Sequence, residues 1–195
     1  MFWFRLKKPR IQTDRLTLRL PTHSDFRQWA ALRLSSKDYL TVWEPAWSRD
    51  HLTRKSFTNR VHWAGRSYSQ GSALALFLIR RVDDTLVGAI TLDNIRRGPS
   101  QSGTIGYWTG QGFARNGYMR EAIEAVSHHA FHRLDLSRLE AACLAENAPS
   151  RGLLEKCGFK YEGVAQSYLQ IDGRWRNHVL YAQLRADRRG RTDAG

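Results

Sequence analysis

The chain has 195 residues, 42% of them hydrophobic, with 31 Lys and Arg against 18 Asp and Glu and a formal net charge of +13. This length and hydrophobic content predict one globular domain and exclude an intrinsically disordered protein. The longest apolar run, Ala73 to Ile79, is far shorter than the ~20 residues of a membrane-spanning helix. The apolar start of the chain is also too short for a secretory signal, so we expect a cytoplasmic protein with no membrane partner.

Part of the positive charge lies in two short terminal segments, residues 1–9 and 185–195. We predict that both segments are mobile and that they flank a single domain over residues 10–184. The body between them is still basic. Two explanations remain open for this charge: a solvated arginine-rich surface, or an acidic partner such as nucleic acid, a ribonucleoprotein or a polyphosphate cofactor.

The N-terminal region predicts a strand followed by a helix. Residues 16–20 alternate apolar and polar side chains, which is the period of a half-buried strand, and Pro21 ends that strand. Ser24 or Asp25 is a suitable cap for a helix that runs through residues 29–34.

The next segment predicts a loop, a helix and three strands. Residues 39–49 contain a proline and three aromatic side chains but no periodicity, so we expect a loop there. A second helix follows and ends near Gly71. After it we expect strands over residues 73–81, 85–92 and 103–109.

The longest amphipathic pattern lies in the second half of the chain. Apolar residues recur at spacings of three and four over residues 118–134, which predicts one face of a helix. Residues 138–144 then predict a strand. Pro149 fits the first turn of a further helix, and Gly158 fits its end, where glycine adopts a left-handed conformation at little cost.

The C-terminal region predicts a β-hairpin. Strands over residues 161–171 and 175–184 meet at Asp172-Gly173, a strong hairpin turn signal. Taken together, the elements predict an α+β, mixed α/β domain with a mostly antiparallel sheet and inserted helices.

A glycine-bearing loop joins the strand ending at Thr109 to the long helix, in the segment GYWTGQGFARNGYMREA. A helix start offers free backbone N–H groups and a positive dipole end, which suit phosphate. A Walker ATPase is excluded, because Tyr118-Met119 stand where that motif needs Lys and Ser or Thr. A dinucleotide fingerprint is also excluded, because Arg115 replaces its third glycine. An ordinary glycine turn before a helix remains the plain alternative.

A second segment, NAPSRGLLEKCGFKYEG from Asn147 to Gly163, adds a more specific signal. Together with QGFARNGYM, it resembles the GNAT superfamily of acetyl-CoA-dependent N-acetyltransferases. The WEP sequence at residues 43–45 and SYLQIDGRWRNHVL near the C-terminus resemble the RimJ/RimL type, which modifies ribosomal proteins. The resemblance covers about residues 10–184 and implies a GNAT-type central twisted sheet of about seven strands flanked by about four helices.

The resemblance also implies where acetyl-CoA binds. Its pantetheine arm would lie in a wedge beside a splayed strand, here at Gly106, Tyr107, Trp108 and Thr109, and pair with the backbone as an extra strand would. Ala114 departs from the family pattern, which has Gln or Arg there, and the guanidinium of Arg115 is a replacement for the lost charge. The backbone cradle for the pyrophosphate would consist of Arg115, Asn116, Gly117, Tyr118 and Met119. Asn147 comes from the second motif.

Catalytic residues follow less directly from the resemblance. Many family members have a tyrosine where this chain has Leu154, and Ser150 lies where the RimL-like branch is thought to have its acid. The plain alternative for Ser150 is a hydroxyl that caps the helix. Glu44 is the candidate for holding or deprotonating the acceptor ammonium, against a plain surface carboxylate.

Tryptophans are candidates for the walls of an acceptor tunnel. Trp43 and Trp175 are the substrate-binding candidates, together with the cofactor-strand residue Trp108, although core packing explains a tryptophan equally well.

The chemistry of the acceptor limits what the enzyme must supply. A free α-amine has a pKa of about 7.7 to 8.0, whereas a lysine amine titrates near ~10.4 and needs a stronger base. Weak help from a base therefore suffices for an α-amine. The thioester oxyanion also needs a donor, and a backbone N–H between Tyr107 and Thr109 is a candidate, worth on the order of 3 kcal/mol.

The histidines and cysteines have plain explanations. His128 and His132 have the i, i+4 spacing of zinc helices but lack the accompanying glutamate, and they point away from the apolar stripe. We expect both to be exposed and no metal to be bound. Cys143 and Cys157 are too few for a disulfide framework, and we expect two reduced, buried thiols.

Two classes of function remain. The leading one is an acetyl-CoA-dependent enzyme that acetylates the N-terminal Ala or Ser of a protein, ribosomal in kind, by direct attack on the thioester, and that meets nucleic acid only through the ribosome. A small amine such as an antibiotic or polyamine is the alternative acceptor. The non-enzyme alternative is a ribosome- or RNA-binding assembly factor on the same fold. The sequence leaves the oligomeric state open.

Overall fold

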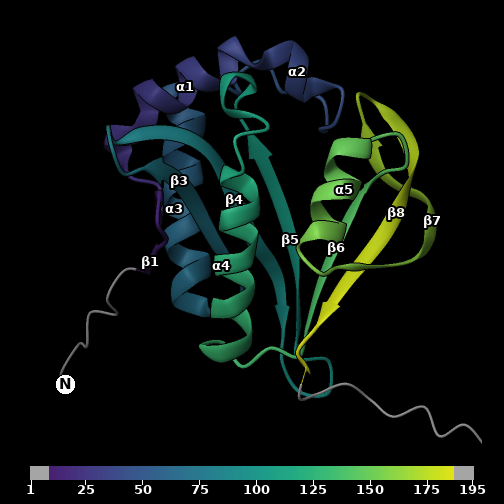
Figure 1. Cartoon of the computed structure of the whole chain (residues 1–195). Coiled ribbons are helices and arrows are strands. Elements are labelled where there is room, and N and C mark those ends of the chain that lie inside the picture. The colour runs from purple at the N-terminus through teal and green to yellow at the C-terminus, as the bar shows by residue number, and fades with distance from the viewer. Residues whose placement is uncertain (1–8, 187–195) are drawn as a thin grey trace, which may run out of the picture.

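The computed structural model describes residues 9–186 and is built on one eight-stranded sheet in the order β1-β2-β3-β4-β5-β6-β8-β7 (Figure 1). The strands are β1 (Arg10–Gln12), β2 (Leu16–Arg19), β3 (Leu74–Arg80), β4 (Thr85–Arg96), β5 (Ser102–Thr109), β6 (Arg138–Leu144), β7 (Lys160–Ile171) and β8 (Arg174–Leu184). The helices are α1 (Phe26–Ser35), α2 (Lys37–Thr41), α3 (Arg54–Gln70), α4 (Tyr118–His132) and α5 (Ala148–Lys156), with 3-10 turns η1 (His23–Asp25) and η2 (Gln111–Phe113).

The mixed, mostly antiparallel sheet with flanking helices confirms the expected fold class. Two elements were not expected. β1 has three residues, too few for an alternating pattern, and α2 overlaps the start of the segment predicted as a loop, where five residues are too few for helical periodicity. None of the helices in residues 9–186 is long and apolar enough to cross a membrane.

The terminal predictions fall largely outside the described residues. Residues 1–8 and 187–195 are not described, so the expected mobility of the two ends lies beyond the structure. Arg185, at the start of the second end, donates to the Asp135 carboxylate at 2.7 Å. The boundaries at residues 10 and 184 remain a prediction.

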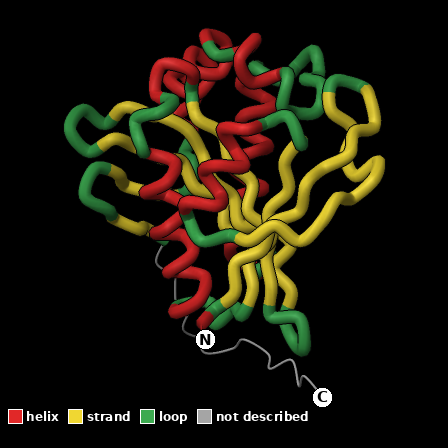
Figure 2. Tube along the Cα trace, turned by 45° about the vertical axis from the view of Figure 1, so that its right-hand side comes forward, coloured by secondary structure: helices red, strands yellow, loops and turns green. Residues whose placement is uncertain are grey.

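All neighbouring strands are antiparallel except β5 and β6. These two are joined through α4, as a parallel pair requires a crossover. Their pairing stops after three residues, with Ser102 to Thr104 opposite Arg138 to Glu140. Beyond that point the strands diverge, and Figure 2 shows them fanning apart from the end where they run close together.

Both faces of the central strands are buried. On β3, Leu76 and Leu78 pack in one cluster with Ile123 and Val126 of α4. The alternate residue Phe77 faces a second cluster that contains Trp29 of α1 and Phe57 of α3. The sheet therefore separates α4 from α1 and α3, as the front and back layers of Figure 1 show.

Turn and cap residues mostly follow the sequence signals. Gly71 ends α3 at φ +68° and Gly158 follows α5 at φ +83°, both left-handed conformations that favour glycine. Asp172 and Gly173 also have positive φ angles and join β7 to β8 as expected. The tip of this hairpin meets the loop before α3, where the Asp172 N–H donates to the Glu44 carbonyl at 3.3 Å.

The expected cap of the first helix was wrong in detail. Asp25 stands at the N-cap position of α1, but its side chain makes no capping hydrogen bond to that helix. It instead accepts a hydrogen bond from the Thr22 backbone N–H at 2.7 Å, at the start of the preceding 3-10 turn. Arg19 of β2 donates to both oxygens of the same carboxylate, at 2.7 and 2.8 Å. Asp25 is 7% exposed, so it joins β2 to the helical layer by buried polar contacts.

Replacing Asp25 with Asn should destabilise the protein by about 1 to 3 kcal/mol at pH 7, because a charge-assisted network is lost. Burial raises the pKa of Asp25, but the hydrogen bonds from Arg19 and Thr22 outweigh it and hold the pKa below its ordinary value. The contribution is therefore complete above the unfolded pKa of about 3.9 and disappears as the pH falls through the folded pKa. Urea unfolding of both proteins from pH 7 to pH 3 should show the difference shrinking; a constant difference would contradict this.

Candidate functional site

The divergence of β5 from β6 creates a wedge with one free strand edge. Gly106 to Thr109 pair with β4 on one side, but their other side lies beyond the last residue pair with β6. The four residues predicted to line the wedge therefore occupy it. Backbone groups on such an edge remain available to an extended ligand that completes the sheet.

A hydrogen-bonded pair of hydroxyls spans the wedge. Tyr107 of β5 and Ser150 of α5 approach with their oxygens 2.8 Å apart. Burial raises the pKa of the Tyr107 phenol above its ordinary value, although the hydrogen bond to Ser150 lowers it. The phenol therefore keeps its proton and is able to donate it to Ser150, which leaves the serine proton free for a ligand in the wedge.

The cap of α5 is Asn147, not Ser150. The Asn147 side-chain oxygen accepts a hydrogen bond from the Ser150 backbone N–H at 3.1 Å. The plain explanation of the Ser150 hydroxyl as a helix cap was therefore wrong, because that hydroxyl faces Tyr107 across the wedge.

The loop before α4 presents a row of backbone donors. Gly117 is the N-cap of α4 with φ +78°, and Arg115 also has a positive φ of 62°. The N–H groups from Arg115 to Met119 have no hydrogen-bond acceptor among the residues that the structure describes. Free donors at a helix start, with the helix dipole behind them, form a site for phosphate.

Arg15, which the sequence patterns did not single out, braces this loop. Its guanidinium donates to Glu121 of α4 at 2.7 Å and to the Asn116 carbonyl at 2.9 Å. It also lies over the Tyr118 ring, with 4.6 Å between the guanidinium carbon and the ring centre. A Cβ added to Gly117 would lie 3.3 Å from the Arg15 guanidinium. Arg15 therefore brings positive charge to the donor row.

A groove of about 400 Å³ lies beside this loop. Its lining joins the turn after β1, the end of β3 and the start of α4, with the residues Asp14, Arg15, Arg80, Arg81, Val82 and Tyr118. Two of the three arginines are paired with carboxylates outside the lining, Arg15 with Glu121 and Arg80 with Asp83. The groove therefore offers guanidinium donors rather than a large excess of positive charge.

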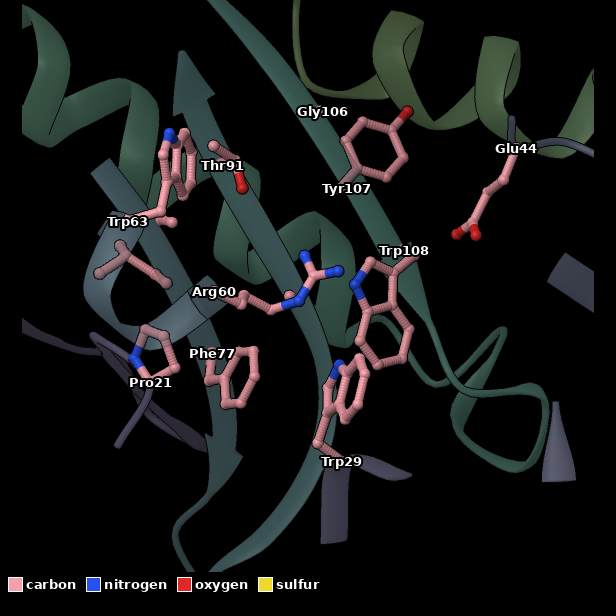
Figure 3. A pocket seen from close by; sticks show the side chains of 13 residues that line it. Pro21, Trp29, Glu44, Arg60, Trp63, Phe77, Thr91, Gly106, Tyr107 and Trp108 are labelled. Atoms are coloured by element: carbon pink, nitrogen blue, oxygen red, sulfur yellow. The ribbon is translucent and has the colours of Figure 1, made fainter. Parts of the chain in front are cut away.

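A separate cavity of about 270 Å³ lies on the face of the sheet that packs against α1 and α3, opposite α4. It reaches the wedge at Gly106 and Tyr107 (Figure 3). Its walls are aromatic, from Trp29 of α1, Trp63 of α3 and Trp108 of β5. Trp108 follows Tyr107 in the strand, so their side chains point to opposite faces of the sheet. The cavity and the wedge thus meet at one short segment of β5.

Glu44 lines this cavity as part of a buried ion pair. Its two oxygens accept hydrogen bonds from Arg33 of α1 at 2.8 and 2.5 Å, and one also accepts from the Trp47 indole at 2.9 Å. Arg33 is 4% exposed and its guanidinium lies between the rings of Trp47 and Trp108, at 4.4 and 4.8 Å. The plain explanation of Glu44 as a surface carboxylate is therefore wrong.

His51 borders the same ion pair and stays neutral near pH 7. Burial and the like charges of Arg33 and Arg60 lower the pKa of His51 to about 4. Its Nε2 atom lies 3.2 Å from the Arg33 guanidinium. Because arginine only donates, Nε2 accepts this hydrogen bond and the ring proton is on Nδ1. The lone pair of His51 Nε2 is thus already occupied by the hydrogen bond from Arg33.

The pattern that could have revealed Arg60 of the cavity, and Arg33 paired with Glu44 beside it, is visible in the sequence. Arg33 follows Trp29 by four residues, and Arg60 lies three after Phe57 and four before Ala64, so both arginines interrupt apolar stripes of their helices. A charged residue on a core-facing stripe needs a partner or a function.

The other predicted residues take these places. Trp43 is half-buried and Trp175 is 65% exposed on β8, and neither lines the cavity, so their substrate roles remain predictions. Cys143 and Cys157 are free and buried, as expected. His128 and His132 are exposed, as expected. Over residues 9–186 there is no group of three or more His, Cys, Asp or Glu side chains that could hold a metal ion.

Comparisons with known proteins agree with this geometry. Residues 15–160 match the family model of the acetyltransferase (GNAT) domain. The [ribosomal protein uS5]-alanine N-acetyltransferase of Escherichia coli is 31% identical over 96% of this chain and 97% of that protein. The solved ribosomal-protein-S5-alanine acetyltransferase from Vibrio fischeri is 25% identical, with a TM-score of 0.85 over 93% of this chain and 100% of that one.

A further solved relative contains a cofactor-derived ligand. Mycobacterium smegmatis RimJ, in complex with CoA-disulfide, is 29% identical, with a TM-score of 0.82 over 91% of this chain and 86% of that one. The family match covers most of the chain. The chain therefore belongs to the GNAT family of acetyltransferases.

Proposed function

We propose that this acetyltransferase uses acetyl-CoA to acetylate the N-terminal α-amine of a protein, with alanine or serine first and with a ribosomal protein as the acceptor. The observation that carries the proposal is the state of two bases, Glu44 in the lining of the cavity and His51 beside the same ion pair. Glu44 is neutralised by Arg33, and the His51 lone pair is occupied. Because neither base is free to take a proton, the cavity suits an amine that is already partly neutral at pH 7. A free α-amine meets this condition.

The residues present fit acetyl-CoA. Its thioester supplies an activated acyl group. The free edge from Gly106 to Thr109 would hold the pantetheine arm, and the N–H groups of Arg115 to Met119 would hold the pyrophosphate. Arg15 adds positive charge beside that loop, which compensates for Ala114 more directly than the exposed Arg115. Asn147 has an amide N–H₂ group left for the ligand, since only its oxygen is used as the cap.

The two faces of β5 would have different roles, with proton donation to the leaving group in the wedge and binding of the amine in the cavity. In the wedge, Tyr107 donates to Ser150, and Ser150 donates to the departing sulfur, so the serine is the catalytic acid and the tyrosine a positioning residue. A backbone N–H between Tyr107 and Thr109 stabilises the developing oxyanion. In the cavity, Glu44 has one carboxylate lone pair left after three hydrogen bonds, and this would hold the incoming ammonium until it releases a proton to water. The nitrogen would release a second proton to water as the carbon–sulfur bond breaks, and Ser150 would regain from water the proton that it gives to sulfur.

The choice of a ribosomal acceptor is supported by the similarity to ribosomal-protein-alanine acetyltransferases and by the charge of the chain. A net charge of +13 favours approach to an acidic assembly such as the ribosome. Contact with nucleic acid would then be indirect, and the enzyme would work in the cytoplasm, where ribosomal proteins are made.

Acetyl-CoA should stabilise the folded protein, because the N–H row exists only in the folded state. At 100 times its dissociation constant the ligand should add about 2.7 kcal/mol. Gly117→Asp should abolish this stabilisation, since the new carboxylate would meet Arg15 and repel phosphate. Thermal melts with and without millimolar acetyl-CoA measure the effect. Gly112→Asp is the matched control, because Gly112 has open space around it; equal loss in both variants, or a wild-type shift no larger than with ATP, would refute the site.

Ser150→Ala should lower kcat by about 100-fold while acetyl-CoA affinity stays within a few fold. General acids are typically worth ~10²- to 10⁴-fold, and a thiol of pKa near ~8.5 leaves with little help, so the low end is expected. Tyr107→Phe should cost less, and the double variant no more than Ser150→Ala, because the two hydroxyls act as a unit. Steady-state kinetics with melting curves test this. Normal turnover in a destabilised Ser150→Ala protein would leave only a structural role.

Peptides that begin with Ala or Ser should be acetylated on the α-amine and not on internal lysines. Tandem mass spectrometry of a peptide with both amines locates the acetyl group. Acetyl on the lysine, or only on an added polyamine or aminoglycoside, would contradict the proposed acceptor while leaving the family intact.

Replacing Glu44 with Gln should raise the peptide KM, because the cationic amine loses its counter-charge. It should also destabilise the fold by about 3 to 5 kcal/mol, since Arg33 becomes an uncompensated buried charge. Kinetics therefore need to be measured well below the melting temperature of the variant. A KM equal to that of the wild type in a folded Glu44→Gln protein would remove Glu44 from amine binding.

A further inference from the structure

We propose that Arg60 recognises an acidic side chain close to the acceptor amine, and so selects acceptors with Asp or Glu among their first residues. The inference rests on the proposed function, because it assumes that the cavity beside β5 receives the acceptor. It assigns a specificity residue to a position that the sequence motifs do not include.

Arg60 is a cation without a partner in the part of the chain that the structure describes. It lies on α3 and lines the cavity, where it remains accessible to solvent. No hydrogen bond or ion pair joins it to any residue between 9 and 186. Its guanidinium lies over the Trp29 ring at 5.4 Å, and Figure 3 shows it beside Trp108, directed into the cavity.

The contrast with Arg33 is informative. Both arginines interrupt the apolar face of a helix, and both meet a tryptophan of the cavity. Arg33 has its carboxylate, Glu44, at bidentate hydrogen-bonding distance. The charges that act on Arg60 are those of Arg33 and Glu44, and Arg33 already satisfies the latter. Arg60 therefore supplies a positive charge that the described protein does not balance.

This excess charge limits which acceptors enter the cavity. Arg33 and Glu44 cancel, His51 is neutral, and Arg60 leaves the lining with a net positive charge. An acceptor amine arrives partly as a cation; the free lone pair of Glu44 receives it at one point, but the net positive charge of the lining opposes its approach. An acceptor that also carries a carboxylate removes the repulsion and forms a charge-assisted, bidentate pair with the guanidinium.

The phosphates of acetyl-CoA are not the anion in question. Their donor row lies at the start of α4, whereas Arg60 is on α3, and the sheet separates the two helices (Figure 1). The cavity has a volume of about 270 Å³, which is below the usual ~300 to 1,000 Å³ of small-molecule sites. It would hold only the first residues of an acceptor chain, and we therefore assign the carboxylate to one of those residues.

The test uses alanine-led peptides of one sequence with Asp or Glu at position 2, 3 or 4, each paired with its Asn or Gln counterpart. Binding is measured by quenching of tryptophan fluorescence or by calorimetry at low salt, and acetylation is measured separately by mass spectrometry. At one position the acidic peptide should bind the wild type about tenfold more tightly than its amide. Arg60→Gln should abolish this preference, and Arg60→Glu should reverse it in favour of Lys at the same position.

Arg66→Gln is the matched control, because Arg66 is an exposed residue of the same helix that does not line the cavity. It makes the same change of net charge and should keep the tenfold preference. The inference is overturned if the wild type binds acid and amide alike at all three positions, or if Arg60→Gln keeps the preference. Acid-selective binding without α-amine acetylation would instead count against the proposed function and leave the role of Arg60 standing.

Discussion

The early end of the pairing between β5 and β6 is the constraint on which the rest of the site depends. Three residue pairs hold the two strands together, and the remainder of β5 has one edge without a neighbouring strand. An unpaired edge in the middle of a sheet costs stability unless a ligand, water or side chain uses its backbone groups. Here α4 begins with unpaired N–H groups at the same end of the sheet, so the feature that weakens the sheet also builds the binding site.

Alternation along β5 then divides the chemistry between two faces. Tyr107 points to the α5 side and meets Ser150, while Trp108 points to the other side and meets Arg33. A strand places neighbouring side chains on opposite faces without any further device. In the proposed mechanism, proton donation to the leaving group and reception of the amine would therefore be kept apart, although both would lie next to the same backbone. This arrangement also explains why Glu44 is held by a buried arginine, since a carboxylate in an aromatic cavity needs a fixed counter-charge.

Prediction from sequence succeeded where a local signal was long or chemically specific. α4 has a complete apolar stripe, and Gly71, Gly158 and Asp172-Gly173 need backbone conformations that few residues adopt cheaply. β1 and α2 were missed because three or five residues show no period. The contacts of the candidate site join residues that are far apart in the sequence, so no local pattern predicts them. Tyr107 and Ser150 are 43 residues apart, and Arg15 and Glu121 are 106 residues apart. Family resemblance supplied the wedge itself, but not Arg15, Arg33 or Arg60.

The contact between the β7–β8 hairpin and the acceptor loop has a mechanical consequence. The hairpin belongs to the half of the sheet beyond the wedge, whereas the loop that contains Glu44 joins helices packed on the other half. A single hydrogen bond, from Asp172 to the Glu44 carbonyl, connects them in the described chain. Across the wedge, the Tyr107–Ser150 hydrogen bond adds a second connection beyond the three pairs of β5 and β6. A ligand that widened the wedge would therefore strain both contacts at once, and through Glu44 it would act on the loop beside the cavity.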